Sequence, residues 1–502
     1  MSGLVGAPQP EKLRGRALWF LPLPAISSAV ALAVVSGGNL LRSLLLTMAF
    51  WILSLPLLGS LEGGLLAIML FEPMRGFFRR AQFIFTDFTP SDPIHLITPL
   101  VTILAFSVLI WIRRERMLIA DPLGKPVAIL GGIFFLQIFN PFQGSVYVGL
   151  SGALFIILPM AWFYFGRYMQ SGFIHSAMMV IVVMGLFCSM HGFYQLFFGF
   201  PAFEQYWIAH TDHYESIAVG HIQRALATFN SAEEWARYVQ YGGVIAFGHL
   251  VGRKQKITRL LWLAISIAFV VIILFTGQRT AIFGLGLGCV SLILASADSM
   301  LGVAKRLVLI SIPALVVLAL VKPPSDSDMW EKDKDDKVGT MLSHSARGTF
   351  QPTKEASLAA RFEIWGHLLA NSLPSRPFGV GLGVGTVAAA RNASTEEELY
   401  PIDSFIAVLI IGSSIPAAIL FLYILFRAMS LAVRNFKAAD PDSDIGIARR
   451  IAIGIIPMLI LNSFFGLTFT IYSAAPIAWM LIGWVCAETA RDSAKAGQLT
   501  SN

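Results

Sequence analysis

The sequence predicts an all-α fold, a polytopic membrane helical bundle of about twelve to fourteen transmembrane helices with one large loop. Two observations predict it. Of the 502 residues, 56% are hydrophobic, only 13% are charged and the mean hydropathy is +0.69, whereas a soluble domain is about one-quarter charged. The apolar residues also gather in runs of roughly 17–25 residues, the length that crosses a bilayer.

Seven apolar runs precede the first long polar segment, at about 17–36, 41–57, 60–72, 94–112, 127–141, 147–166 and 172–198. Seven more follow, at about 236–252, 259–276, 279–297, 306–322, 402–427, 449–468 and 470–488. The first run follows Lys12, Arg14 and Arg16 and lacks a clear cleavage site, so we expect an uncleaved span rather than a signal peptide. The runs at 60–72 and 127–141 are short, which is why the expected number is a range.

Basic residues in the short loops predict the orientation. They cluster at 113–125, 253–259, 305–306 and 427–450. All of these loops and both termini then fall on one side, which the positive-inside rule makes cytoplasmic. The segment Met74–Phe85 would fall on the other side, and its mixture of aromatic residues and arginines is typical of an interfacial helix. Topology and lipid headgroups thus explain the surplus of seven positive charges, which does not indicate nucleic-acid binding.

Two long segments face outward in this topology. The chain therefore divides into N-terminal transmembrane helices (1–198), an outward loop with Arg224 (199–235), central helices (236–322), a large outward loop (323–401) and C-terminal helices with a cytoplasmic tail (402–502). Within the large loop, Ser357 is placed to cap a helix that runs through Arg361 and Trp365.

The stretch 275–281 joins two apolar runs by a very tight hairpin and places Arg279 at a membrane face. A guanidinium at mid-depth costs between about 3 and 15 kcal/mol, so Arg279 needs water or an anionic partner. Neither flanking run, 260–274 or 282–295, contains an acidic residue. The partner is therefore a distant part of the chain or a ligand, and we favour a ligand, a lipid diphosphate.

Three arginines stand on the outward side: Arg224, Arg279 and Arg361. The planar fork of arginine forms two parallel, charge-assisted hydrogen bonds with a diphosphate and does not deprotonate. Three such groups would neutralise a lipid diphosphate leaving group, which is electrostatic catalysis without a metal. The alternative for each is a solvated or salt-bridged structural arginine, and this alternative is strongest for Arg361.

Other polar patterns do not predict a cofactor or metal site. The outward histidines, His210, His213 and His221, do not have the spacing of metal ligands. The segment 379–385 contains four glycines, but no strand precedes it, so it predicts a close-packed turn rather than a dinucleotide site. Its backbone amides are still candidates for holding an anion.

Four segments, in this order, resemble conserved segments of O-antigen ligases and Wzy-type polysaccharide polymerases. They span roughly 193–426, about half of the chain, and comprise Arg224-Ala-Leu-Ala-Thr-Phe-Asn230 with the following Ser231–Tyr238, Thr276-Gly-Gln-Arg-Thr-Ala281, Ala360-Arg-Phe-Glu-Ile-Trp365 with Pro377–Gly383, and Asp403-Ser-Phe-Ile-Ala-Val-Leu-Ile-Ile-Gly412. The hairpin departs from the family pattern because Gln278 stands where a serine is usual.

The resemblance implies a GT-C-like membrane fold and a metal-independent, cofactor-free, inverting glycosyl transfer on the periplasmic face of a bacterial inner membrane. The donor would be a glycan on undecaprenyl diphosphate, and a chain-length regulator is a candidate partner. The implied catalytic residues are Arg279, Arg224, Arg361 and Asp403. The implied substrate-binding residues are Arg224, Arg279, Asn230, Trp365 and Gly381.

Three functions stay open at this point. The segment Tyr400–Asp403 lacks the histidine that ligases have, which favours a polymerase of exopolysaccharide or O-antigen over a ligase that transfers glycan to another acceptor. A transporter or flippase is the third alternative, and the gathering of charge on the outward side disfavours it. The general base is also open, with four candidates: Asp403, Glu233, Glu234 and His344.

Overall fold

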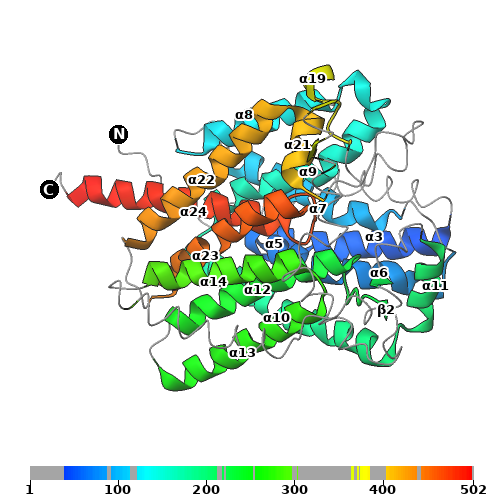
Figure 1. Cartoon of the computed structure of the whole chain (residues 1–502), viewed down its shortest axis with the longest axis horizontal. Coiled ribbons are helices and arrows are strands. Elements are labelled where there is room, and N and C mark those ends of the chain that lie inside the picture. Colours follow the sequence, from blue (N-terminus) through cyan, green and yellow to red (C-terminus); the bar gives the residue numbers. More distant parts are fainter. Residues whose placement is uncertain are drawn as a thin grey trace. The chain divides into compact units, whose positions relative to one another are not determined.

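The computed structural model describes residues 39–87, 92–113, 121–211, 218–219, 222–252, 255–296, 302, 363, 365–366, 370–371, 373–384, 403–437 and 443–499. Across these residues the secondary structure is helical apart from one hairpin of two-residue strands, as Figure 1 shows. Six helical segments are long and apolar enough to cross a membrane: Leu40–Gly59, Val146–Tyr168, Ser171–Phe198, Lys256–Phe275, Arg279–Ser296 and Ile415–Phe436. The described part is thus an all-helical, multi-pass bundle of the predicted class.

The chain divides into two compact units. The first comprises Met1–Met117 and Phe200–Tyr214. Its elements are α3 (Leu40–Ser54), α4 (Pro56–Gly59), α5 (Leu61–Phe71), η1 (Glu72–Met74), α6 (Arg75–Ala81), η2 (Gln82–Ile84), α7 (Ile94–Arg113) and α11 (Ala202–His210).

The second unit comprises Leu118–Gly199 and Glu215–Asn502. Its helices are α8 (Gly124–Gln137), η3 (Pro141–Gln143), α9 (Val146–Tyr168), α10 (Ser171–Phe198), α12 (Ala232–Gly252), α13 (Lys256–Phe275), α14 (Arg279–Ser296), α19 (Leu373–Ser375), α21 (Phe405–Ser413), α22 (Ile415–Lys437), α23 (Asp444–Phe465) and α24 (Ala475–Leu499). Its strands, β1 (Ala218–Val219) and β2 (Ile222–Gln223), pair antiparallel.

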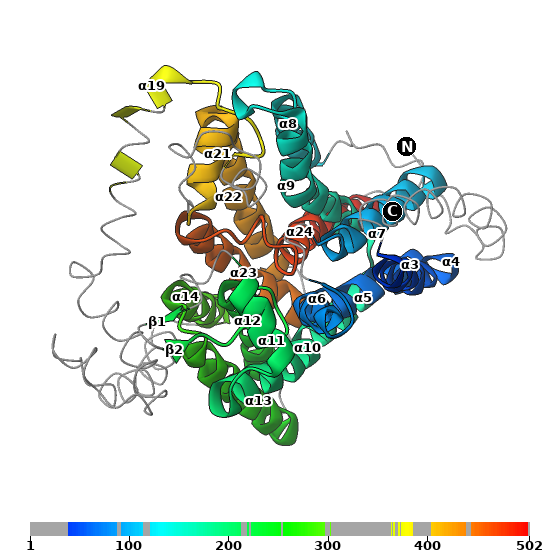
Figure 2. The same cartoon turned by 90° about the vertical axis from the view of Figure 1, so that its right-hand side faces the viewer.

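The helices follow the apolar runs of the sequence closely. Two of the predicted runs, 17–36 and 306–322, lie outside the described residues. The run at 402–427 is not one helix, because Ser414 has a positive φ of 98° and separates α21 from α22. A non-glycine residue in this backbone region is uncommon and costs free energy, so packing around it must hold the break in place. In Figure 2, α21 and α22 lie beside α8.

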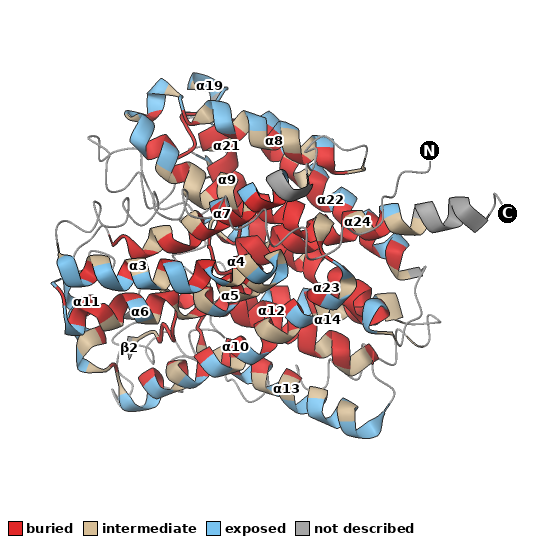
Figure 3. Ribbon diagram, turned by 180° about the vertical axis from the view of Figure 1, so that it is seen from behind, coloured by how far each residue is buried: buried red, intermediate tan, exposed pale blue. Residues whose placement is uncertain are grey.

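Helix α12 forms the centre of the second unit. It packs against α10, α13, α14 and α23, and almost every residue from Trp235 to Ala246 is buried. Helix α13 instead buries only one face, and Figure 3 shows the contrast between the two helices. An apolar helix face that is exposed in a membrane protein is a lipid-facing surface, so α13 lies at the periphery and α12 in the interior.

The first unit contains a buried network of ion pairs. Arg75 Nε donates to Glu72 Oε1 (2.7 Å), and Thr98 Oγ1 donates to Glu72 Oε2 (2.5 Å). Arg80 Nε donates to Glu204 Oε1 at 2.8 Å, which fastens α11 to α6. Both side chains of that pair are almost completely buried, at 1% and 0% exposure.

This network changes the interpretation of the predicted interfacial segment. Its arginines do not reach outward to lipid headgroups, because Arg75, Arg79 and Arg80 are 3%, 6% and 0% exposed. The apolar side chains Ile84 and Phe85 are exposed instead. The segment therefore buries its arginines in ion pairs and exposes apolar side chains. This arrangement suits a surface that contacts the hydrocarbon of a membrane.

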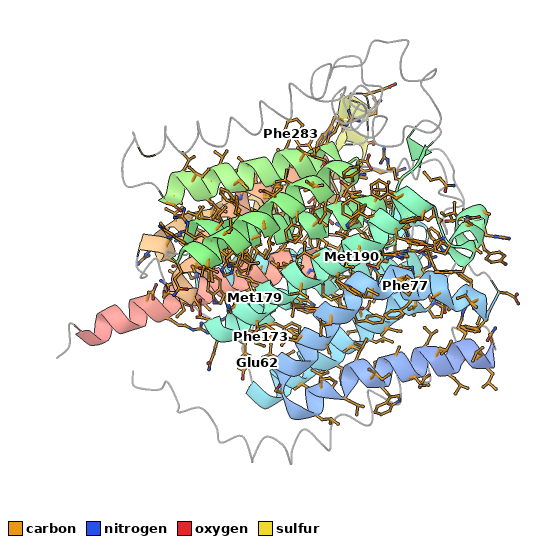
Figure 4. All side chains as sticks on the ribbon, turned by 90° about the horizontal axis from the view of Figure 1, so that it is seen from below. Glu62, Phe77, Phe173, Met179, Met190 and Phe283 are labelled. Atoms are coloured by element: carbon orange, nitrogen blue, oxygen red, sulfur yellow. The ribbon has the colours of Figure 1, made fainter. Side chains whose placement is uncertain are left out.

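Removing Glu204 should strongly destabilise the first unit. In Glu204→Ala the Arg80 guanidinium stays buried without its carboxylate, and breaking such a pair costs about 3–5 kcal/mol. Thermal unfolding of the detergent-purified protein measures this as a lower midpoint. The control is Glu62→Ala at the exposed start of α5 (Figure 4), which should leave the midpoint unchanged. Equal midpoints for the two variants would contradict a stabilising role for the Arg80–Glu204 pair.

Candidate functional site

The hairpin between α13 and α14 is built by local hydrogen bonds. Thr276 Oγ1 donates to the carbonyl of Ile273 (2.7 Å) and accepts from Gln278 N (3.3 Å). Gly277 between them has φ of +66°, a conformation that glycine adopts without strain. The carbonyl of Gln278 then accepts from the backbone N–H groups of the first turn of α14, at 3.1 and 3.3 Å. Gln278 thus starts the helix through its backbone, which serine would do equally well, and Arg279 is the first helical residue.

A second local structure positions Arg224. The loop after β2 is held by Gln195 of α10, whose Oε1 accepts from Leu226 N (2.9 Å) and Ala227 N (2.8 Å). Gln195 Nε2 also donates to the carbonyl of Ala227 (3.1 Å). Ala227 has a positive φ of 49°, so these bonds hold a backbone conformation that its side chain disfavours. Arg224 therefore lies two residues from a rigidly clamped turn.

The start of α12 is a variant of the capping box. Ser231 Oγ accepts from Glu234 N (3.1 Å), and Glu234 Oε2 accepts from both Asn230 N (3.1 Å) and Asn230 Nδ2 (3.0 Å). Both groups of Asn230 are therefore engaged in starting the helix. The sequence predicts that Asn230 binds substrate. In the structure its backbone N–H and its side-chain amide both donate to Glu234 at the start of α12.

Three residues predicted from the sequence meet at Arg224. Burial lowers the pKa of the Arg224 guanidinium, the neighbouring Arg279 lowers it further, and the carboxylates of Asp403 and Glu233 act in the opposite direction. These charges come from the loop before α12, the first residue of α14, the second residue before α21 and the first turn of α12. The Nε of Arg224 is buried and has no hydrogen-bond partner among the described residues. Arg224 and Arg279 repel each other electrostatically, and an anion bound near them would relieve this repulsion.

Asp403 reaches this cluster through the loop between α23 and α24. Ser404 caps α21 by accepting from Ala407 N (3.3 Å), and Phe405 N donates to the carbonyl of Gly466 (3.0 Å). A Cβ at Gly466 would meet Arg237 Nη2 at 2.0 Å and Glu233 Oε1 at 3.0 Å. Position 466 therefore requires glycine because the backbone packs directly on these side chains. Asp403 itself is exposed.

Arg237 connects the parts of the site, and the sequence analysis did not single it out. It is 1% exposed and donates to Asn462 Oδ1 (2.7 Å), Thr280 Oγ1 (2.9 Å), Glu233 Oε1 (3.3 Å) and the carbonyl of Phe465 (3.3 Å). Thr280 directly follows Arg279, so Arg237 ties the hairpin to α12 and α23. A signal was available, because Arg237 stands at the start of an apolar run that should hold no charge.

The glycine-rich segment after Pro377 is a close-packed turn, as predicted. Val380 N donates to the carbonyl of Ile411 (2.8 Å), Gly381 N to that of Gly412 (3.0 Å) and Leu382 N to that of Gln137 (3.3 Å). The turn is thereby fixed to the end of α21 and the end of α8. Since these amides have partners, a substrate contact at Gly381 would need another group of that residue.

Other predicted residues are less well placed. Arg361 and His344 lie outside the described residues, and Trp365 is half-buried in a short described stretch of the large loop. Glu233 and Glu234 both accept hydrogen bonds from protein groups. Within the described ranges, no group of three or more His, Cys, Asp or Glu side chains is placed to hold a metal ion.

No protein-family model matches the chain, and no curated protein matches it. The interpretation of the site therefore rests on its geometry.

Loss of the Gln195 clamp should loosen the Arg224 loop. In Gln195→Met the N–H groups of Leu226 and Ala227 lose their acceptor, at roughly 1–3 kcal/mol for each unsatisfied group. We expect faster trypsin cleavage after Arg224 under native conditions, measured by mass spectrometry of the fragments. Gln170→Met, exposed at the other end of α10, is the matched control. Equal cleavage rates in both variants would show that Gln195 does not hold the loop.

Proposed function

We propose that the protein is an inverting glycosyltransferase that polymerises glycan repeat units linked to undecaprenyl diphosphate, at the periplasmic face of a bacterial inner membrane. The observation that supports this most is the meeting of Arg224 and Arg279 from distant parts of the chain, beside the carboxylate of Asp403. A pair of arginines suits the geometry of a diphosphate, which each can bind through two hydrogen bonds. The apolar bundle beneath them suits a ligand whose diphosphate is attached to a lipid.

In the proposed reaction, an acceptor hydroxyl attacks the anomeric carbon of the donor sugar from the face opposite the diphosphate. The bond between that carbon and the diphosphate oxygen breaks, and the configuration inverts. Negative charge grows on the leaving diphosphate, and Arg224 and Arg279 stabilise it more strongly in the transition state than in the bound donor. The N-terminus of α14 adds to this stabilisation of the diphosphate, because a helix N-terminus favours an anion.

The acceptor hydroxyl must also lose its proton. Of the carboxylates near Arg224, Glu233 accepts from Arg237 Nη2 and Leu467 N, both at 3.3 Å. Glu234 accepts from Asn230. Asp403 is exposed and lies beside the arginines, so we assign it the role of general base.

The test is a reaction with purified protein and a lipid-linked repeat unit, in the presence of a metal chelator. A polymerase produces a ladder of longer chains that remain on undecaprenyl diphosphate. A single transfer to a different acceptor would identify a ligase instead. No transfer with any lipid-linked donor, from protein whose fold is intact, would overturn the assignment.

A further inference from the structure

A row of polar side chains lies buried where α12, α14 and α23 pack together (Figure 2). Arg237 Nη1 donates to Asn462 Oδ1 at 2.7 Å, and Asn462 Nδ2 donates to Gln240 Oε1, also at 2.7 Å. Gln240 Nε2 then donates to the carbonyl of Ala281, in the first turn of α14, at 3.1 Å. Asn462 and Gln240 are completely buried, at 0% exposure. We call this connection from Arg237 through Asn462 and Gln240 to Ala281 the amide bridge.

The two ends of the amide bridge fix the direction of every hydrogen bond in it. The guanidinium of Arg237 can only donate, and the carbonyl of Ala281 can only accept. Asn462 must therefore turn its oxygen to Arg237, and Gln240 must turn its NH2 group to Ala281. A flip of either amide would set donor against donor or acceptor against acceptor. The bridge thus has a single paired arrangement, and a fully paired buried network of this kind makes its surroundings rigid.

The amide bridge holds the helix that begins at Arg279. Ala281 lies two residues after Arg279 and receives the bond from Gln240. The residue between them, Thr280, accepts from Arg237 Nη2 at 2.9 Å. The first turn of α14 is therefore fixed at two adjacent residues, in one case by Arg237 and in the other by Gln240.

Helix α14 also packs directly on the two amides. A Cβ built at Gly284 would overlap Gln240 Nε2 and lie 3.1 Å from Asn462 Oδ1. Gly284 is one turn further along the helix than Ala281, so the backbone of α14 fits against the bridge over its first two turns. The absence of a side chain at position 284 is what allows this fit.

We propose that Asn462 and Gln240 are positioning residues for the transfer reaction, which hold Arg279 and the N-terminus of α14 in place for the diphosphate. The inference rests on the proposed function and adds the residues that set the geometry of its leaving-group site. Both amides are buried, so they act through α14 and not by contact with the substrate. A group that stabilises transition-state charge must be in place before the reaction, and a displacement of about 1 Å can lower the rate about 100-fold.

The variant Asn462→Asp breaks the bridge and keeps an acceptor for Arg237. Beside that guanidinium the new carboxylate stays ionised, and it repels Gln240 Oε1. If Gln240 flips to donate to the carboxylate, its oxygen meets the carbonyl of Ala281. We expect kcat to fall about 10- to 100-fold, and KM for the lipid-linked donor to change by less than about threefold, because the charge to be stabilised is largest in the transition state.

The variant Asn435→Asp is the matched control. Asn435 is 2% exposed, and its amide donates to the carbonyl of Val485 (2.8 Å) and accepts from Thr489 Oγ1 (2.7 Å). Its backbone carbonyl accepts from Arg449, which lies at the opposite end of α23 from Asn462. The change is chemically the same, so the melting temperature should fall in this variant too. Both kcat and KM should stay at the wild-type values.

Two glycine variants on α14 test the same inference without changing a polar group of the bridge. In Gly284→Ala the new methyl group displaces the amide of Gln240, whereas a Cβ at Gly286 meets nothing within 4 Å. We expect Gly284→Ala to lower kcat as Asn462→Asp does. Gly286→Ala should keep the wild-type kcat.

The rates are compared at a temperature at which each variant is folded. Wild-type kcat in Asn462→Asp or Gly284→Ala, with a lower melting temperature, would make the bridge purely structural and overturn the inference while the proposed function stands. An equal loss of kcat in Asn435→Asp would overturn it too, as would failure of both bridge variants to fold. Absence of transfer by the wild-type protein would overturn the proposed function itself, and the inference with it.

Discussion

Arg279→Ala is expected to lower the rate of glycan transfer by roughly 100- to 1000-fold, the loss typical when one group that stabilises transition-state charge is removed. Arg279→Lys should recover little of it, because an ammonium is a point charge that cannot form two parallel hydrogen bonds with the diphosphate. The measurement is the initial rate of chain growth with purified lipid-linked donor, at saturating donor so that it reports kcat.

The same variant should not lose stability. Arg279 is the first residue of α14, where the helix dipole disfavours a cation by about 0.3–1 kcal/mol, and it also faces the charge of Arg224. Arg279 also has favourable contacts that offset these repulsions, so Arg279→Ala is expected to melt at about the same temperature as the wild type. Arg427→Ala, an exposed arginine on α22, is the control for both measurements. A large drop in melting temperature would instead make Arg279 a structural residue.

Arg237→Met is the second variant with a large expected effect, and it should reduce both stability and transfer. The buried guanidinium has four hydrogen-bond partners. Its loss removes the donor to Asn462 Oδ1 and leaves the Glu233 carboxylate without its cation, with only the backbone N–H of Leu467 still donating to it. We expect a cost of about 3 kcal/mol in the free energy of unfolding. Transfer should fall as well, because the hairpin is no longer tied to α23. Unfolding midpoints and initial rates at a temperature where the variant is folded measure the two effects separately.

Thr280→Val separates positioning from stability. It removes only the 2.9 Å bond between Arg237 and the hairpin, at a cost of about 1 kcal/mol. A small displacement of Arg279 can still reduce the rate up to about 100-fold, so kcat should fall while the melting temperature barely changes. Thr258→Val, at the other end of α13, controls for the same chemical change. Unchanged kcat in Thr280→Val would show that Arg237 stabilises the fold without positioning the arginine.

The general fold could be predicted from the sequence because the bilayer imposes one simple rule, a long apolar run for each span. Thus α9, α10, α13 and α14 lie where the hydropathy predicts them. The break at Ser414 was missed although the sequence marks it, because Gly412 and Pro416 flank it and both residue types interrupt helices. The burial of Arg80 could not be predicted, because its partner Glu204 is 124 residues away in the sequence.

The candidate site was predictable where a single residue conflicts with its surroundings. Arg279 stood out because a charge so near hydrocarbon needs a partner. Its neighbours were less visible, since the clamp by Gln195 and the ties through Arg237 depend on helices brought together by folding. Their sequences look like ordinary polar positions near the ends of spans. A polar residue inside an apolar run, such as Asn462 or Gln240, is the signal that would have indicated this network.

The most direct test of the account is binding of undecaprenyl diphosphate to the purified protein in the presence of a metal chelator, measured for the wild type and for Arg224→Gln/Arg279→Gln. We expect the wild type to bind the diphosphate more tightly than undecaprenyl monophosphate, and the double variant, still folded, to lose this preference. Equal binding by the wild type and the double variant would contradict the claim that Arg224 and Arg279 form a diphosphate site.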